Sequence, residues 1–364
     1  MTLHVVHLVA SFDTGGLQNG VVNLANNMDS DRVRHTVLSL SSRIGMAERL
    51  RQSDALTLGL DGKAHRGAWR IIAEKLRNLD VDILHTRNQA TWLDGICAAR
   101  RAGISHRIHG FHGRDLNQVN GLSLARRVLG RVLATATDRF VTLTPSMREE
   151  FASEFFISPD RFEIIANGFD LDRFTPRTCD ENVSDAFTVA TVGRLVPVKN
   201  LALLLRGFAA MKSRKSTDRL SIVGDGEQRH SLEELARTLG IAEAVEFEGM
   251  VEDPSPVYAS ADVYVQPSYY EGMSNTIVEA MASGVAVIAT DVGGNADVVG
   301  RDGSGVLVSS DDTLALAAAL DAYRADPEWR RKVARVGQQR VSERFSLEKM
   351  VEAYLATYES MVRN

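Results

Sequence analysis

Short apolar runs rich in β-forming residues alternate with longer segments of helical periodicity along almost the whole chain. This alternation favours an α/β architecture with parallel strands. In the first half, the predicted strands are 3–10, 35–40, 55–60, 81–85, 106–110, 139–143 and 162–166. In the second half, they are 187–192, 220–223, 245–247, 263–266, 285–289 and 305–308. We therefore predict two doubly wound, Rossmann-like halves.

Helical patterns lie between these strands and close the chain. They include 68–79, 89–101, 201–211, 232–239, 275–283, 327–341 and 347–362. The polar segment 175–186 contains Pro176 and shows no periodicity, which is typical of a linker. The length of 364 residues allows two domains, each with its own core. We predict one domain over 1–177 and another over 186–344.

The composition is that of an ordinary globular protein, with 44% hydrophobic residues and a net charge of −5. The two cysteines, Cys97 and Cys179, indicate neither a disulfide framework nor a cysteine metal site. Residues 1–12 lack a basic region and are predicted to form a buried strand rather than a signal peptide. We expect a cytoplasmic protein, soluble or peripheral on the inner face of the membrane, with no nucleic-acid partner.

Open sheets of this class bind ligands at the carboxyl ends of their strands, and two facing halves would form a cleft between them. Gly15 and Gly16 follow the first predicted strand and precede a helix. Adjacent glycines allow a close backbone approach, and the helix N-terminus suits an anion. A tight turn without a ligand explains the same pair equally well.

Arg194 and Lys199 follow Gly193 at the end of the first strand of the second half. Two cations five residues apart at this position can converge on a diphosphate. The alternative is a pair of solvated surface cations. Their place after the strand favours the binding interpretation.

A loop containing Glu271 leads into a helix that starts near Ser274 or Asn275 and ends at Gly284. Its N-terminal N–H groups suit a phosphate. Glu271 and Glu279 would flank that phosphate and accept hydrogen bonds from sugar or ribose hydroxyls. The helix dipole alone would explain two acids at a helix start, but it would not explain the Glu-Gly-Met-Ser loop.

A further polar cluster ends a strand of the first half and contains two histidines. It comprises Arg107, His109, His112, Gly113, Arg114 and Asp115. One histidine there would more often be structural, but the cluster favours a functional loop.

Together these motifs resemble the retaining GT-B enzymes of glycosyltransferase family 4. The resemblance spans the chain and looks strongest to sugar transferases of bacterial exopolysaccharide clusters. Its most specific elements are G-R-L-x-x-x-K and E-x7-E in the second half. The matching residues are Gly193, Arg194, Leu195, Lys199, Glu271, Glu279, the 167–170 and 224–226 motifs, Gly293, Gly294 and 344–346. One departure is Asp297, where the family usually has a glutamate.

The resemblance implies a GT-B fold with an acceptor-side first domain that the last helix, 346–364, crosses back to join. It implies that Arg194 and Lys199 bind the donor diphosphate, and that Glu271 contacts the sugar and Glu279 the ribose. His112 would lie near the transferred sugar, and the loop with Met250 and Val251 beside the base. Other implied donor-binding positions are Gly15, Gly16, Gly193, Gly272, Met273, Ser274, Asn275 and Thr276.

The implied reaction moves a sugar with retention from a nucleotide-diphosphate donor, UDP-linked in preference to GDP-linked, to a glycan or lipid-linked acceptor. Exopolysaccharide or cell-envelope glycan synthesis is the implied setting. Protein cations would replace a metal, so no metal or other cofactor is expected. Asp170 and Asp172 have D-x-D spacing but lie in the Asn-Gly-Phe-Asp motif, which is interpreted as structural.

Alternatives are a non-hydrolysing nucleotide-sugar epimerase of the same fold and a non-catalytic nucleotide-sugar-binding protein. A nicotinamide dehydrogenase is disfavoured because Arg229 occupies the third glycine position of its fingerprint.

Arginines are concentrated between residues 100 and 139, where only Asp115 and Asp138 oppose them. Within this region, 122–136 is predicted to be an amphipathic helix with Leu122, Leu129 and Val132 towards one side. Such a helix can contact an anionic membrane. It can equally pack on its own sheet with a solvated basic face.

Overall fold

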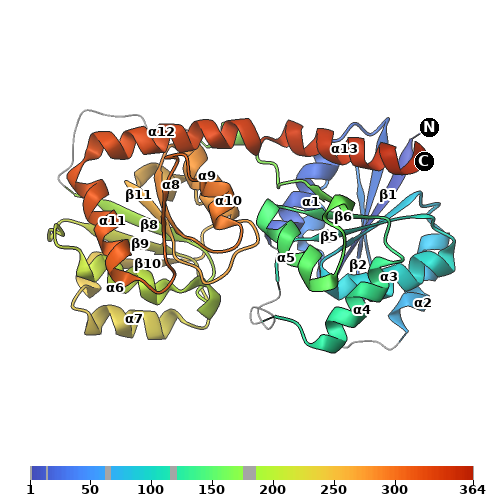
Figure 1. Ribbon diagram of the computed structural model, residues 1–364, viewed down its shortest axis with the longest axis horizontal. Helices are drawn as coiled ribbons and strands as arrows, with labels where there is room; N and C mark the ends of the chain where they lie inside the picture. The colour runs from blue at the N-terminus through green and yellow to red at the C-terminus, as the bar shows by residue number, and fades with distance from the viewer. Residues whose placement is uncertain (1, 14, 62–66, 115–120, 175–185, 364) are drawn as a thin grey trace. The chain divides into compact units, whose positions relative to one another are not determined.

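The computed structural model describes residues 2–13, 15–61, 67–114, 121–174 and 186–363 (Figure 1). Thr14, Asp115, Cys179 and nearly all of the predicted linker lie outside them. The chain forms two compact units, Met1–Phe169 with Phe345–Asn364, and Asp170–Arg344. Residues 170–174 belong to the second unit, whereas the sequence placed them in the first. The reason is their surroundings, because Leu171 and Phe174 line a cavity of about 540 Å³ together with Ala282 and Val341 of the second unit.

In the first unit, the described residues form a seven-stranded parallel sheet in the order β3-β2-β1-β4-β5-β6-β7. The strands are β1 (Leu3–Val9), β2 (Val33–Ser39), β3 (Asp54–Thr57), β4 (Ile83–Arg87), β5 (His106–Phe111), β6 (Arg139–Thr142) and β7 (Phe162–Ile164). The helices are α1 (Gly16–Asn27), α2 (Ala68–Arg77), α3 (Gln89–Ala102), α4 (Leu124–Ala134), α5 (Pro145–Phe155) and α13 (Leu347–Arg363).

In the second unit, a six-stranded parallel sheet has the order β10-β9-β8-β11-β12-β13 among the described residues. Its strands are β8 (Thr188–Val192), β9 (Arg219–Val223), β10 (Val245–Gly249), β11 (Val263–Gln266), β12 (Ala286–Thr290) and β13 (Val306–Val308). The helices are α6 (Leu201–Ala210), α7 (Arg229–Thr238), α8 (Ser255–Ser260), α9 (Asn275–Ala282), α10 (Asn295–Val299), α11 (Thr313–Ala325) and α12 (Pro327–Arg344).

These two sheets confirm the predicted α/β, doubly wound class. The order of each sheet reverses once, between β1 and β4 in the first unit and between β8 and β11 in the second. In such sheets the reversal opens a crevice at the carboxyl ends of the two strands. The prediction that the two halves face one another across a cleft stays a prediction. Within the described part of the chain, no helix is both long and apolar enough to cross a bilayer.

Histidines form an unusual polar layer in the buried core of the first unit. His7 and His35, on neighbouring strands, share a hydrogen bond of 2.9 Å, and His85 Nδ1 lies 3.0 Å from the hydroxyl of Tyr358 on α13. Burial lowers the pKa of all three, and the Arg87 guanidinium lowers it further. For His35 the pKa falls to about 3. These rings are therefore neutral in the folded protein near pH 7.

We expect this layer to make the protein sensitive to mild acid. An unfolded histidine takes up a proton near pH 6.5, whereas buried His35 stays neutral down to about pH 3. The contribution of the neutral, buried histidines to the free energy of unfolding is thus complete above pH 6.5 and is lost as pH falls. His35 alone should lower the free energy of unfolding by about 2 kcal/mol between pH 6.5 and 5.

Urea denaturation at several pH values between 8 and 5 measures the slope of the free energy of unfolding against pH. His35→Asn should flatten it, whereas His230→Asn, at an exposed site on α7, should leave it unchanged. An equal slope in wild type and His35→Asn would show that His35 already takes up its proton in the folded state.

Candidate functional site

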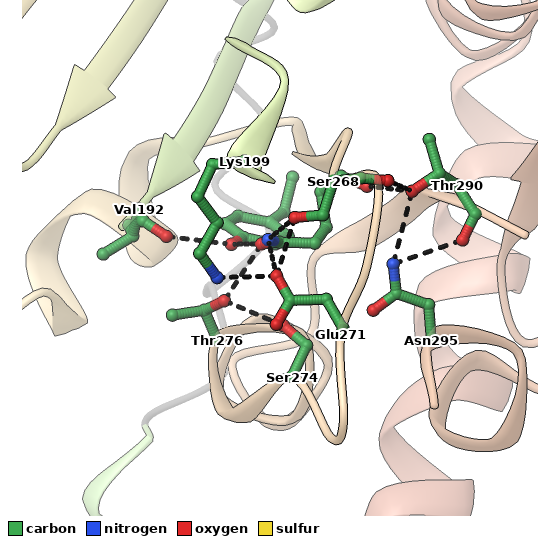
Figure 2. A network of polar contacts seen from close by, with 10 residues as sticks. Val192, Lys199, Ser268, Glu271, Ser274, Thr276, Thr290 and Asn295 are labelled. Carbon is green, nitrogen blue, oxygen red and sulfur yellow. Dashed lines mark hydrogen bonds and ion pairs between the residues drawn. The ribbon is translucent and has the colours of Figure 1, made fainter. Parts of the chain in front are cut away.

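Two predicted site residues meet at the strand-order reversal of the second unit. Lys199 follows β8, and Glu271 follows the adjacent strand β11. Lys199 Nζ donates to Glu271 Oε1 at 2.6 Å, and both side chains are largely buried (Figure 2). A carboxylate thus already balances the lysine charge at this crevice.

The same carboxylate oxygen accepts two further hydrogen bonds. Gln266 Nε2 donates to Glu271 Oε1 at 2.8 Å, and Ser268 Oγ donates at 2.6 Å. The other oxygen, Oε2, has no hydrogen-bond partner in the part of the chain described. Three donors therefore fix the orientation of Glu271 and leave one oxygen able to accept from another molecule.

Gln266 links this pair to the start of α9. Its amide oxygen accepts from the Tyr264 hydroxyl at 2.6 Å and from Thr276 Oγ1 at 3.1 Å. Thr276 in turn shares a hydrogen bond with Ser274, as Figure 2 shows. Lys199, Glu271, Ser274 and Thr276, all predicted from sequence, thus belong to one hydrogen-bond network.

Close backbone contacts at two glycines fix the loops that carry these side chains. A Cβ on Gly224 would lie 1.9 Å from the carbonyl oxygen of Gly193, which begins the loop to Lys199. A Cβ on Gly293 would lie 2.1 Å from the carbonyl oxygen of Glu271, and Gly294 N–H donates to that oxygen at 2.9 Å. Both Gly224 and Gly293 have positive φ, so a side chain is excluded there on two counts.

The helix α9 begins at Asn275, and the side chain of Ser274 does not cap it. A helix N-terminus of this kind suits an anion. The predicted extent of this helix, 275–283, is close to the observed Asn275–Ala282. Gly272 and Met273, which belong to the loop before α9, are buried.

Glu279 lies one turn into α9 and accepts a hydrogen bond of 2.8 Å from the hydroxyl of Tyr258 on α8. Loss of hydration raises the pKa of its carboxyl to about 7, although the Tyr258 hydrogen bond and Arg173 oppose that rise. Glu279 is therefore poised to change charge near neutral pH, unlike an ordinary surface glutamate.

Other predicted donor-binding residues lie outside this network. Arg194 is exposed and has no ion-pair partner among the described residues, so it does not share the carboxylate of Lys199. Met250 is 75% exposed, and Val251 beside it is partly buried, just after β10. The predicted convergence of Arg194 and Lys199 on a diphosphate stays a prediction, and in this structure Lys199 pairs with Glu271.

In the first unit, the predicted residues also lie near the strand-order reversal. Gly15 caps α1, which begins at Gly16 directly after β1 and its short loop. His112 follows β5, and its backbone N–H donates to Asn88 Oδ1 at 2.9 Å.

Arg87, at the end of β4, controls the ring of His112. It is only 2% exposed, and its Nη1 lies 3.0 Å from His112 Nε2 and donates to the Tyr354 hydroxyl at 3.0 Å. Its Nη2 contacts His7 Nδ1 at 3.1 Å. A guanidinium only donates, so the Nε2 of His112 accepts and the neutral ring carries its proton on Nδ1. Burial and Arg87 both lower the pKa of His112.

His112 Nδ1 is buried and has no hydrogen-bond partner among the described residues. The ring can therefore offer an N–H donor at the carboxyl end of the first sheet. The ring of His109 stacks on Trp92 at 4.4 Å and its Nδ1 lies 2.8 Å from Thr86 Oγ1, while its Nε2 is likewise buried without a hydrogen-bond partner among the described residues.

Arg87, Gln266 and Ser268 were not singled out from the sequence. Arg87 and Gln266 are polar residues at the ends of apolar strands, and this position is the signal that could have identified them. Arg114 is not a free cation, because it pairs with Glu150 and with Glu154 at 2.7 Å. Asp170 and Asp172 are exposed, and the described residues contain no cluster of three or more acidic, histidine or cysteine ligands.

Comparison with known proteins shows which family the chain is similar to. A model described as Glycosyltransferase Family 4 matches residues 14–173, and one described as Glycosyl transferases group 1 matches residues 186–326. The D-inositol 3-phosphate glycosyltransferase of Saccharomonospora viridis is 32% identical over 305 residues, 76% of this chain and 69% of that protein. Across several other proteins of that name, the matched region spans 55% to 65% of their length.

The UDP-Gal:alpha-D-GlcNAc-diphosphoundecaprenol alpha-1,3-galactosyltransferase of Escherichia coli is 28% identical over 259 residues, 67% of each chain. The crystal structure of Alr3699/HepE from Anabaena in complex with UDP and glucose shares the fold. It has a TM-score of 0.83 at 19% identity, over 98% of this chain and 100% of that one. Because the two family models together cover most of its length, the chain belongs to the group 1, family 4 glycosyltransferases.

Proposed function

We propose that this protein is a retaining glycosyltransferase. In this proposal it transfers a sugar from a nucleotide-diphosphate donor, preferably a UDP-sugar, to a glycan or lipid-linked acceptor in exopolysaccharide or cell-envelope glycan synthesis. The observation that carries the proposal is the Lys199–Glu271 pair at the β8/β11 reversal, beside the N-terminus of α9. It combines a cation, helix N–H groups and an oriented carboxylate, which suit a diphosphate joined to a sugar.

The charge that develops in the reaction explains the cations. Cleavage of the anomeric C–O bond leaves an oxocarbenium-like sugar and new negative charge on the leaving diphosphate. Lys199, Arg194 and the N-terminus of α9 stabilise that charge as it forms. Since protein groups take this role, no metal is needed.

Retention follows if the acceptor attacks from the face that the diphosphate leaves. The acceptor oxygen forms the new bond to the anomeric carbon, and its proton passes to the departing phosphate oxygen. This route requires no covalent nucleophile from the protein.

The carboxylates bind hydroxyl groups in this scheme. Glu271 Oε2 accepts from a donor-sugar hydroxyl, because its partner oxygen is already occupied by three donors. Glu279 accepts from the ribose, and the loop with Met250 and Val251 lies beside the base. In the first unit, His112 donates from Nδ1 to the transferred sugar, with Arg87 as the positioning residue, and Gly15 and Gly16 approach the diphosphate.

Two comparisons support the substrate classes. The solved structure of Alr3699/HepE contains UDP and glucose, which favours a UDP-sugar donor here. The Escherichia coli relative is named for transfer of galactose to a diphosphoundecaprenol-linked sugar, which favours a lipid-linked acceptor.

A donor screen tests the proposal directly. UDP-sugars should raise the melting temperature in proportion to the logarithm of their concentration, and GDP-sugars less. With acceptor, the same donor should give a glycosylated product that retains the donor's anomeric configuration, and EDTA should not abolish its formation. Turnover of the nucleotide-sugar without acceptor would instead identify an epimerase. Binding without any turnover would identify a non-catalytic protein.

Removal of either cation should weaken catalysis. We expect Arg194→Ala or Lys199→Ala to cost about 2–5 kcal/mol of transition-state stabilisation, a loss of roughly 30-fold or more in kcat/KM. Arg206→Ala, an exposed arginine on α6, is the matched control and should retain activity. Activity within about threefold of wild type in both test variants would exclude them from the diphosphate site.

The two glutamates should give opposite results in calorimetry with UDP. Glu271→Gln frees Lys199 from its carboxylate, so UDP should bind as tightly as in wild type or up to about tenfold more tightly, while turnover falls by about two orders of magnitude. Glu279→Gln should weaken UDP binding.

The Glu279 effect should depend on pH, because its carboxyl has a pKa of about 7. An ionised carboxylate is the stronger acceptor, so the gap between wild type and Glu279→Gln should be wide at pH 8 and close towards pH 6. A gap that does not change with pH would show that Glu279 keeps one charge state over this range. Weaker UDP binding in Glu271→Gln, with unchanged binding in Glu279→Gln, would reverse the assignment of the two acids.

A further inference from the structure

Helix α4 has its apolar residues on the outside. Leu124, Val128 and Val132, spaced four residues apart, are 72%, 56% and 59% exposed, and Leu129 beside them is 41% exposed. Residues at this spacing lie along one face of a helix. We call this face, with Leu129, the α4 stripe. A helix that merely covers its own sheet would bury such a stripe.

The opposite face of α4 packs against the rest of the first unit. Its buried residues are Gly130, Leu133 and Ala134. A Cβ on Gly130 would lie 2.2 Å from the Phe155 ring, so α4 is packed closely against α5. The stripe is therefore not a core surface, and contiguous exposed apolar residues of this kind mark contact sites.

Positive charge borders the stripe. Helix α4 contains Arg126, Arg127 and Arg131 and no acidic residue. Arg100 and Arg101 are exposed at the end of α3, which contacts α4 (Figure 1). Since the whole chain carries a net charge of −5, this basic surface is a local feature.

The arginines of this region are not all equivalent. Arg107 pairs with Asp138, and Arg114 with Glu150 and Glu154, so neither contributes free charge. Arg127 lies over the Phe156 ring and donates to the carbonyl of Glu154, which gives it a structural role. Arg126 and Arg131 are exposed and have no ion-pair partner among the described residues, so they are available for an external anion.

We infer that the α4 stripe and its arginines form a docking surface for an anionic lipid bilayer. The apolar side chains would enter the boundary between headgroups and acyl chains, while Arg126 and Arg131 contact lipid phosphates. A second copy of the chain fits less well, because it would bring two basic faces together. This inference does not depend on the catalytic assignments above.

Co-sedimentation of the full chain with vesicles tests the inference. Wild type should sediment with phosphatidylglycerol–phosphatidylcholine vesicles at low ionic strength, should be released as salt rises, and should not bind phosphatidylcholine alone. Arg126→Gln with Arg131→Gln should weaken binding roughly 30-fold. Arg237→Gln with Arg331→Gln, two exposed arginines of the second unit, is the matched control and should bind like wild type.

The apolar contribution needs a second variant. Val128→Ser with Val132→Ser should weaken vesicle binding at every salt concentration and leave the melting temperature nearly unchanged, since both sites are exposed and serine and valine have similar helix propensities. Wild type that stays in the supernatant at low salt would overturn the inference. The inference would also be overturned if the control arginine variant lost as much vesicle binding as Arg126→Gln with Arg131→Gln. A third contradicting outcome is that the serine substitutions abolish self-association in sedimentation velocity but leave vesicle binding unchanged.

Discussion

The strand order of each sheet determines where its polar side chains can meet. In the second unit, β8 lies between β9 and β11, so the chain builds one side of the sheet before it returns to build the other. The loops after β8 and β11 therefore begin side by side at the carboxyl ends of neighbouring strands, where the Tyr269 N–H donates to the carbonyl oxygen of Val198 at 2.8 Å. Lys199 and Glu271 meet there, although 72 residues separate them. Gly224 and Gly293 maintain this geometry, because any side chain at either position would collide with the loops that carry the pair.

The buried cations of the two units have different kinds of partner. Lys199 has a carboxylate partner, whereas the Arg87 guanidinium contacts neutral groups, among them the rings of His7 and His112 and the Tyr354 hydroxyl, and its Nε has no hydrogen-bond partner among the described residues. A buried charge without a counter-charge is costly unless hydrogen bonds replace its hydration. The surrounding histidines supply acceptors and must stay neutral to do so, which agrees with their lowered pKa values. The polar core of the first unit is thus organised around one guanidinium.

Much of the fold could be predicted from the sequence, because the apolar runs of buried parallel strands are continuous and clearly bounded. The predicted strands all occur, and α9 was placed within one residue. Contacts between loops far apart in the chain could not be predicted, since they depend on strand order. The pairing of Lys199 with Glu271, 72 residues away, is one such contact.

The exposure of the apolar face of α4 could not be predicted from the sequence either. The periodicity of 122–136 correctly indicated an amphipathic helix, but an apolar face looks the same in sequence whether it is inward or outward. Only the packing of Gly130 against Phe155 shows which side of α4 is inside. Arg87 was missed for a related reason, because a charged residue at the end of an apolar strand is usually taken as the start of a loop.

The hydrogen-bond network around Glu271 also has an entropic consequence. A free lysine side chain samples many rotamers, and restricting it costs about 1.5–2 kcal/mol. Here Glu271 already restricts Lys199 in the folded protein, and Gln266 and Ser268 in turn restrict Glu271. Much of this conformational entropy is therefore lost during folding. A diphosphate that replaces Glu271 as the partner of Lys199 would meet an ammonium group that is already localised at the crevice, so less side-chain freedom remains to be lost on binding.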